Sequence, residues 1–331
     1  MVQRETGGDA ARLQAALAGL RLYQQAVREP APALPRAIAS AASGAVLRDY
    51  GGTGPPIVFI PSLINPPSIL DLSAERSLLR WLAANGHRPL LLDWGEDAQA
   101  RRSLSIGGHV EDIVLPLIET LGEPPALVGY CLGGTMAVAA AALTPVTKLA
   151  TIAAPWHFSG FPAEARKMLL ALWRGALAST RRLGVLPMEI LQSAFWSLDP
   201  ARSVAKFEAF SLTVPGSDAA RAFVALEDWA NDGPPMSEAA AREMFEDLFE
   251  SDRPGSGAWR VGGKRIDPAA LACPTFNIVS TTDCIVPHAT AISSGERLDL
   301  ARGHVGMVVG RHAEAGLWRP LSAWLSRNRP N

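Results

Sequence analysis

Four short apolar runs alternate with helical segments between residues 57 and 153, and this alternation is the feature that most constrains the fold. The runs are rich in Ile, Val, Leu and Ala, as are strands buried on both faces of a sheet. They span residues 57–60, 89–93, 126–129 and 149–153. Helical patterns at 77–84, at 110–121 and from 132 to about 143 separate them. Such alternation predicts an α/β fold, with a mostly parallel sheet and helices on both faces.

The alternation stops near residue 156 and resumes only near residue 256. The intervening residues, 157–255, carry helical patterns with many aromatic side chains and no clear buried strand. We therefore expect a helical cap inserted into a core formed by residues 46–156 and 256–331. Further strands are expected at 275–279 and 297–300, followed by a closing helix at 313–326. Residues 1–45 are expected to form an N-terminal helical extension, broken at Pro30–Pro35.

The amino-acid composition argues against several classes of protein. The chain has 331 residues, of which 48% are hydrophobic, and its 31 Lys and Arg nearly balance 32 Asp and Glu. This balance argues against nucleic acid or an anionic membrane as the main partner. Three cysteines without regular spacing predict neither a disulfide framework nor a zinc site. The chain begins without an apolar run, and no stretch is long enough to span a bilayer, so we expect a cytoplasmic protein without a signal peptide.

The pattern Gly129-x-Cys131-x-Gly133 lies between a predicted strand and a predicted helix. This is the context of a nucleophile elbow, in which a tight turn with small flanking residues lifts the nucleophile above the sheet. Cys131 stands where serine is usual, and a thiolate exchanges readily with thioesters, which favours acyl transfer. The alternative is a buried structural cysteine on a glycine-rich turn. The elbow predicts the α/β-hydrolase fold.

The elbow also predicts where a developing oxyanion is bound. The backbone N–H of Leu132, at the start of the following helix, is the first expected donor. The second is expected in the loop after the first core strand, near Ser62 and Leu63.

Candidates for the acid and the base follow the nucleophile in the order that this fold requires. Asp283 begins the loop after the strand at 275–279, and His304 follows Gly303 after the last predicted strand. We expect His304 to act as general base and Asp283 to orient its imidazole. Asp93 also ends a strand, but it precedes the nucleophile and is more consistent with a loop-shaping carboxylate. The other five histidines are more consistent with structural roles.

These segments together resemble the polyhydroxyalkanoate synthase family. The elbow is similar to the lipase-like box of that family, and five further segments agree in order over roughly residues 57–312. The matching segments are Gly129-Tyr130-Cys131-Leu132-Gly133-Gly134-Thr135, Ile69-Leu70-Asp71-Leu72, Leu92-Asp93-Trp94-Gly95, Trp229-Ala230-Asn231-Asp232, Asp283-x-Ile285-Val286-Pro287 and Gly303-His304-Val305-Gly306-Met307.

The resemblance implies a reaction and its partners. A 3-hydroxyacyl-CoA would acylate Cys131 with release of CoA, and a hydroxyl group, deprotonated with help from His304 and Asp283, would attack the thioester to extend a polyester. Coenzyme A enters as part of the substrate, and no cofactor or metal is expected. The long N-terminal domain of larger synthases is absent, so the chain resembles the short type, which works with a separate partner subunit. A homodimer at the surface of polyester granules is expected.

Two departures from the family pattern flank the expected active-site entrance. Cys284 stands where the family often has histidine after the acid, and Pro66-Pro67-Ser68 stands where it often has aromatic residues or arginine.

Two other functions remain open. A thioesterase, esterase or polyester depolymerase would use the same three side chains, with water as the acceptor. Dienelactone hydrolases share the Gly-x-Cys-x-Gly elbow, but they lack the long insertion found here. A non-catalytic scaffold on storage granules is disfavoured by the intact cysteine, aspartate and histidine.

Overall fold

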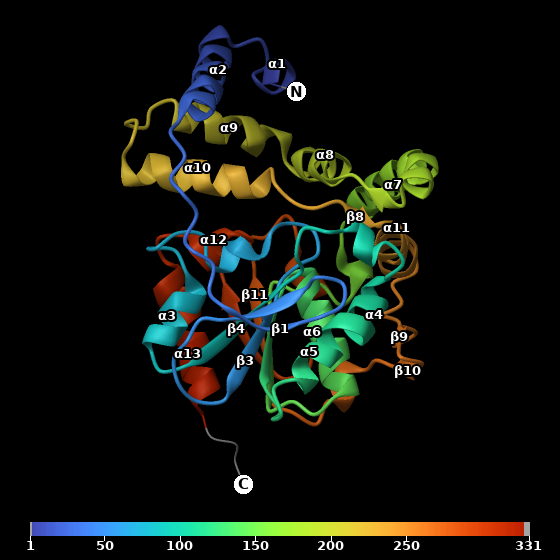
Figure 1. Ribbon diagram of the computed structural model, residues 1–331. Helices are drawn as coiled ribbons and strands as arrows, with labels where there is room; N and C mark the ends of the chain where they lie inside the picture. Colours follow the sequence, from blue (N-terminus) through green and yellow to red (C-terminus); the bar gives the residue numbers. More distant parts are fainter. Residues whose placement is uncertain (1, 328–331) are drawn as a thin grey trace.

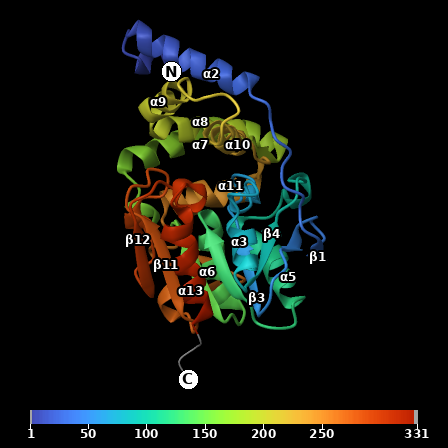
Figure 2. The ribbon, with the colours of Figure 1, turned by 90° about the vertical axis from the view of Figure 1, so that its left-hand side faces the viewer.

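The computed structural model describes residues 2–327, and its centre is an eight-stranded sheet (Figures 1 and 2). The spatial order is β1-β2-β4-β3-β5-β6-β11-β12, in which β3, β4, β5, β6, β11 and β12 run parallel. The strands are β1 (Ala37–Ser40), β2 (Val46–Asp49), β3 (Pro56–Ile60), β4 (Arg88–Asp93), β5 (Ala126–Tyr130), β6 (Lys148–Ile152), β11 (Thr275–Ser280) and β12 (Glu296–Leu300). The predicted mostly parallel sheet is confirmed, and each predicted strand matches an observed one within one residue at either end.

The strands alternate their side chains between two apolar layers, as the pleat of a strand requires. In β3, Val58 and Ile60 face one layer, while Ile57 and Phe59 face the other. The first layer packs under α6 (Leu132–Leu143) and the second under α3 (Leu78–Ala84) and α13 (Arg319–Ser326). Burial on both faces explains why these strands are continuous apolar runs in the sequence.

Two predicted helices are interrupted by π-helical turns. The segment predicted at 110–121 consists of α4 (Ile106–His109), a π-helical turn (Val110–Val114) and α5 (Leu115–Glu119). The closing helix begins with a π-helical turn (Glu314–Trp318) before α13. Each includes a proline near the start of its final α-helical part, Pro116 or Pro320, and proline removes one backbone donor there.

Helices cover the carboxyl edge of the sheet (Figures 1 and 2). They are α7 (Ala163–Leu183), α8 (Met188–Leu198), α9 (Pro200–Phe210) and α10 (Asp218–Ala230). A short antiparallel ladder of β7 (Val185–Leu186) and β8 (Met236–Ser237) lies at their base, followed by α11 (Glu238–Arg242) and a π-helical turn (Glu243–Glu250). The chain then forms a small hairpin, β9 (Arg260–Val261) and β10 (Lys264–Arg265), before β11.

The expectation that residues 1–45 are only helical is wrong in its last part. Helices α1 (Val2–Glu5) and α2 (Ala10–Gln25) are followed by an extended segment and then by β1, which pairs antiparallel with β2 at the edge of the sheet. The four residues of β1 are mostly exposed, so they lack the apolar pattern that marks a buried strand. The pairing with β2, which itself pairs with β4, decides their conformation.

No helix within residues 2–327 combines the length and the apolar character that crossing a bilayer requires.

Candidate active site

Cys131 lies at the turn between β5 and α6, in a backbone conformation that is rare for a residue with a side chain. Its φ is 54° and its ψ is −132°, and it is the N-cap residue of α6. Its own N–H donates to the carbonyl of Ile152 at 2.9 Å, which ties the turn to β6. Such strain persists only where the surroundings enforce it, and it is typical of functional sites.

The glycines of the elbow allow the turn to form. A Cβ on Gly129 would lie 2.4 Å from the Cα of Gly134, and a Cβ on Gly133 would lie 2.1 Å from the carbonyl oxygen of Ile60. The loop after β3 therefore packs directly against the first turn of α6, and no larger residue fits between them. This contact brings the loop containing Leu63 to the base of the elbow.

Asp283 and His304 meet at the carboxyl edge of the sheet, beyond β11 and β12. His304 Nδ1 lies 2.6 Å from Asp283 Oδ2. The other carboxylate oxygen accepts the backbone N–H groups of Ile285 at 2.7 Å and Val286 at 3.1 Å. Both ring and carboxylate are buried, so the aspartate is held by three donors in a single orientation.

Cys131 lies close enough to His304 to raise its pKa, both by charge and by a side-chain hydrogen bond. Because Nδ1 faces Asp283, the contact with the thiol uses Nε2. Burial would lower the pKa of His304, but the charges of Asp283 and Cys131, with hydrogen bonds to both, outweigh it and raise the pKa from 6.5 to about 10. The imidazole is therefore held as the cation, between a carboxylate and the sulfur. The three residues singled out from the sequence are in contact.

Tyr130 is a neighbour of the site that sequence reasoning did not single out. Its ring packs against that of His304 at a centroid distance of 5.1 Å, and its hydroxyl donates a long hydrogen bond, 3.5 Å, to the His304 carbonyl. Burial, with the nearby charges of Cys131 and Asp283, raises the pKa of Tyr130 well above its usual value, so the phenol stays neutral. In the sequence, only the position of Tyr130 next to Cys131 in the elbow could have indicated that it lies at the site.

The backbone N–H groups of Leu63 and Leu132, near the elbow, have no protein acceptor within the described chain. Both residues are buried. The first N–H groups of a helix have no acceptor within that helix, so the Leu132 N–H, at the start of α6, is available to an acceptor outside the chain. Leu132 is the first oxyanion donor predicted from the sequence, and Leu63 lies in the loop predicted to supply the second.

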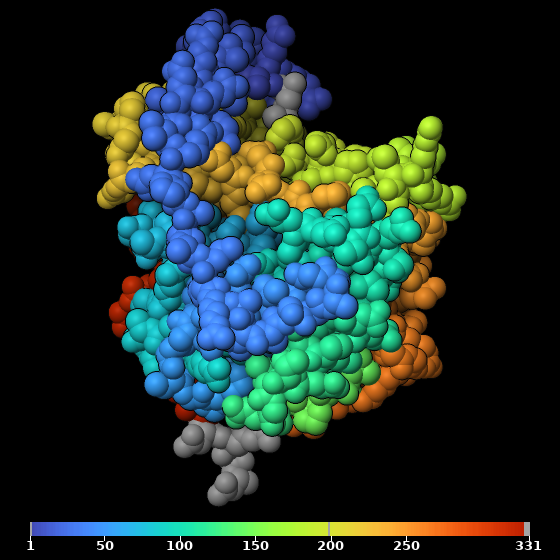
Figure 3. Space-filling model, in the orientation of Figure 1, coloured from blue at the N-terminus to red at the C-terminus, as the bar shows by residue number. Residues whose placement is uncertain are grey.

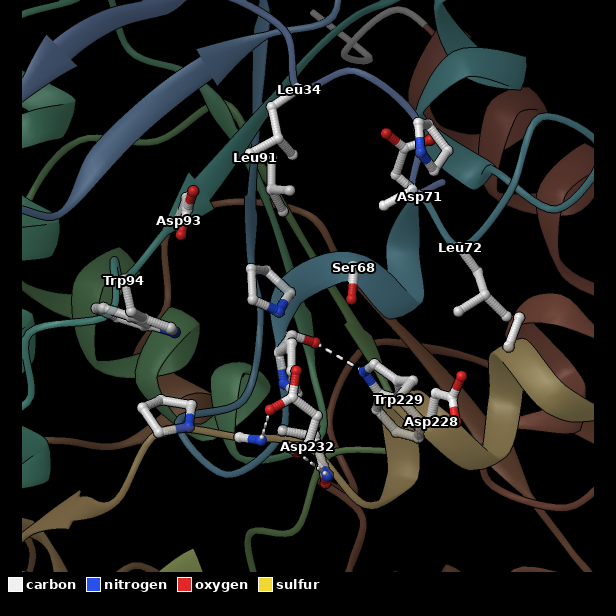
Figure 4. A pocket seen from close by; sticks show the side chains of 18 of the residues that line it. Leu34, Ser68, Asp71, Leu72, Leu91, Asp93, Trp94, Asp228, Trp229 and Asp232 are labelled. Carbon is white, nitrogen blue, oxygen red and sulfur yellow. Dashed lines mark hydrogen bonds between the residues drawn. The ribbon is translucent and has the colours of Figure 1, made fainter. Parts of the chain in front are cut away.

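A cavity of about 1090 Å³ lies beside these residues, between the core, α10 and the extended segment after α2. Figure 4 shows Trp94 and Trp229 at its wall, and the Trp229 indole donates to the Pro66 carbonyl at 2.8 Å. Leu63 and Pro66–Ser68 line this cavity, whereas Cys131, Asp283 and His304 do not. The cavity therefore adjoins the site across the loop after β3, and one of the two departures from the family pattern lies in its wall.

The remaining candidates have structural partners. Asp93 accepts from Arg48 at 2.7 Å and from the Gly95 N–H at 3.0 Å, so it shapes the loop after β4. His87 is hydrogen-bonded to Ser322, and His109 to the Ser105 carbonyl. Cys284 is exposed beside Asp283. No group of three or more potential metal ligands was found among the described residues.

Comparison with known proteins identifies the family. The model of the alpha/beta hydrolase fold matches residues 55–305. Two solved structures agree in fold: a monoacylglycerol lipase from Paleococcus ferrophilus (17% identity, TM-score 0.52, 85% of this chain and 98% of that one) and an esterase from Thermogutta terrifontis (17%, 0.51, 89% and 98%).

The curated relatives indicate a more specific class of protein than the fold alone does. They include poly(3-hydroxyalkanoate) polymerase subunits PhaC from Haloferax mediterranei (27% identity over 82% of this chain), Haloarcula marismortui (25%, 86%) and Allochromatium vinosum (26%, 82%). The chain spans 58% and 63% of the two haloarchaeal relatives and 80% of the third. The chain therefore belongs to the α/β-hydrolase fold family. Within that family it is similar to polyhydroxyalkanoate polymerases, as the sequence motifs predict.

Proposed function

We propose that this chain is an acyltransferase that polymerises 3-hydroxyacyl groups from coenzyme A thioesters into a polyester, with release of CoA. The observation that carries the proposal is the contact of Cys131 with a buried imidazole that Asp283 orients. The polymerase relatives support this reaction over others of the same fold.

The geometry suggests a role for each group. The Cys131 thiolate attacks the thioester carbonyl, and the N–H groups of Leu63 and Leu132 bind the resulting oxyanion. As CoA leaves, the imidazolium of His304 gives its proton to the departing sulfur. The now neutral imidazole takes the proton of an incoming 3-hydroxyl group, whose oxygen attacks the acyl-enzyme. The new ester forms, and the Cys131–His304⁺ pair is restored.

The partners follow from the same proposal. Coenzyme A is part of the substrate, and no further cofactor takes part. A separate partner subunit, a homodimer, and a place at polyester granules in the cytoplasm are proposed by analogy with the family. Exposed apolar side chains on and after the cap helices, such as Leu183, Trp196 and Leu212, support contact with an apolar surface.

Purified protein incubated with 3-hydroxybutyryl-CoA tests the reaction. We expect release of CoA together with polyester of high mass. Release of CoA with only free 3-hydroxybutyrate would assign the chain to the thioesterases instead. If no CoA is released, the assay is repeated with longer acyl chains and with the separate partner subunit of a relative's polymerase before the proposal is abandoned.

Cys131→Ala tests the nucleophile. We expect this variant to form no acyl-enzyme, as measured by intact mass after reaction with the thioester, and to keep the melting temperature of the wild type. Cys284→Ala is the matched control, because Cys284 is an exposed thiol close to the site that has no proposed role. Retained turnover in Cys131→Ala would refute the assignment.

A further inference from the structure

The loop after β3 is held by an indole that comes from the neighbouring strand. Trp94 directly follows β4 and is buried, and its Nε1–H points at two carbonyls of the loop. The nitrogen lies 3.1 Å from the oxygen of Ser62 and 3.4 Å from the oxygen of Pro61. One N–H shared between two consecutive carbonyls restricts the rotation of both peptide groups.

The orientation of these peptides determines where their N–H groups point. The Ser62 carbonyl and the Leu63 N–H belong to one planar trans peptide, so they point in opposite directions. With the carbonyl turned to Trp94, the Leu63 N–H is turned away from the indole. The Leu63 N–H donates no hydrogen bond within the described chain. The next N–H, that of Ile64, is already occupied by the Ser62 hydroxyl at 3.2 Å.

Arg101 and His109 in turn hold Trp94 in place. The Arg101 guanidinium, buried, donates to the carbonyls of Trp94 and, at 3.2 Å, of Gly95. The His109 ring packs edge-on against the indole at 5.7 Å, and its Nδ1 bonds the Ser105 carbonyl at 2.7 Å. These contacts hold both the backbone and the indole ring of Trp94 in place. The position of Trp94 therefore determines the position of the loop after β3.

We propose that Trp94 is a positioning residue for acyl transfer: its indole N–H orients the Pro61 and Ser62 carbonyls so that the Leu63 N–H is aimed at the oxyanion formed on Cys131. The proposal rests on the function proposed above. It does not require Trp94 to touch the substrate. Its effect is confined to steps in which a carbonyl oxygen gains negative charge.

Two reactions of Cys131 separate this role from a general structural one. Acylation by a thioester or by p-nitrophenyl butyrate passes through an oxyanion, whereas alkylation by iodoacetamide does not. Both rates are measured at Cys131 by peptide mass spectrometry, which excludes the other thiols. Trp94→Phe keeps the aromatic packing and removes the N–H. Trp324→Phe is the control, because Trp324 is equally buried (3% exposed, as is Trp94) and its indole bonds Glu296 at 3.0 Å, on β12.

We expect Trp94→Phe to slow acylation by about tenfold to a hundredfold, as displacement of one oxyanion donor does, with alkylation changed by less than about twofold. The control variant is expected to leave the ratio of the two rates unchanged. Equal losses in both reactions, or no loss of acylation, would overturn the proposal. Replacing Trp94 with benzothienylalanine, which exchanges N–H for sulfur at nearly constant shape, gives the same test if the phenylalanine variant does not fold.

The reactions of the wild-type protein with the two acyl donors separate a failure of this inference from a failure of the proposed function. Acylation of Cys131 by p-nitrophenyl butyrate but by no 3-hydroxyacyl-CoA would refute the polymerase function, and the test of Trp94 would still be decided with the ester. A wild-type Cys131 that neither acyl donor modifies would overturn both.

Discussion

At the scale of single residues, the site depends on one buried cation. His304 lies between Asp283 and Cys131, and Tyr130 covers its ring. Burial opposes the charge on the imidazole, and two oppositely charged neighbours more than compensate for it. The order of these effects explains why a buried histidine here titrates far above its ordinary pKa, whereas burial lowers the pKa of His109 to about 4.

The raised pKa predicts a dependence of stability on pH. Because the pKa of His304 is about 10 when folded and 6.5 otherwise, its charge stabilises the native state fully below about pH 6.5. This contribution is lost as the pH rises through 10. We expect the difference in melting temperature between the wild type and His304→Gln to shrink steadily between pH 7 and pH 10. His312→Gln, at an exposed position, is the control, and a difference that grows with pH would contradict the assignment.

At the scale of elements, the elbow and the loop after β3 form one unit. The first turn of α6 approaches the end of β3 so closely that only hydrogen fits on Gly133. The same loop carries Leu63 and contacts Trp94 from the adjacent β4. Three neighbouring strands of the parallel sheet therefore contribute to one small backbone structure at their carboxyl ends, where this class of fold binds ligands.

A methyl group at Gly133 tests this contact. Gly133→Ala would place a Cβ 2.1 Å from the Ile60 oxygen and 2.5 Å from the Pro61 oxygen, so backbone must move. We expect a loss of about 1–3 kcal/mol in the free energy of unfolding, with loss of acylation. Gly175→Ala in α7 is the matched control, because no atom lies within 4 Å of its Cβ position, and it should stabilise by about 0.5–1 kcal/mol. Chemical denaturation measures the free energy of unfolding of both variants. A Gly133→Ala variant as stable as the wild type would contradict the close contact.

At the scale of the whole molecule, the N-terminal segment connects the cap helices to the sheet. Helix α2 lies on α9, and the chain then runs down the outside of the molecule to β1 (Figures 2 and 3). Tyr23 and Arg28 both bond Asp228 of α10, and Arg80 donates to the Ala33 carbonyl at 2.9 Å. Segments remote in sequence are thus held together on one side of the large cavity.

The crossing of α2 and α9 determines this connection. A Cβ on Gly19 would lie 1.9 Å from the Phe207 carbonyl oxygen, so a larger side chain forces the helices apart. We expect Gly19→Leu to release α2 and to make residues 26–36 at least about tenfold more sensitive to limited proteolysis. Ala18→Leu, at an exposed position on the same helix, should leave the rate unchanged. Equal cleavage rates for the two variants would show that the crossing does not hold the segment.

The parallel sheet and the residues at its carboxyl ends could be predicted from the amino-acid sequence alone. Strands buried on both faces need continuous apolar side chains, so β3, β4, β5, β6 and β11 were visible as runs. Candidates for the site followed from them, because Cys131, Asp283 and His304 each come soon after a strand.

The features that depend on contacts between distant segments could not be predicted without the three-dimensional structure. Strand β1 is short and mostly exposed, so its conformation comes from pairing with β2, which itself pairs with β4, rather than from any local pattern. Tyr130 packs against His304 because the loop after β12 returns to the end of β5, two strands away from β12's neighbour β11. Trp94 reaches the loop after β3 because β4 lies beside β3. The free energies of such contacts arise between chain segments and leave no periodic signal in either one. The sequence therefore indicates which residues can act, and the packing of the strands decides what orients them.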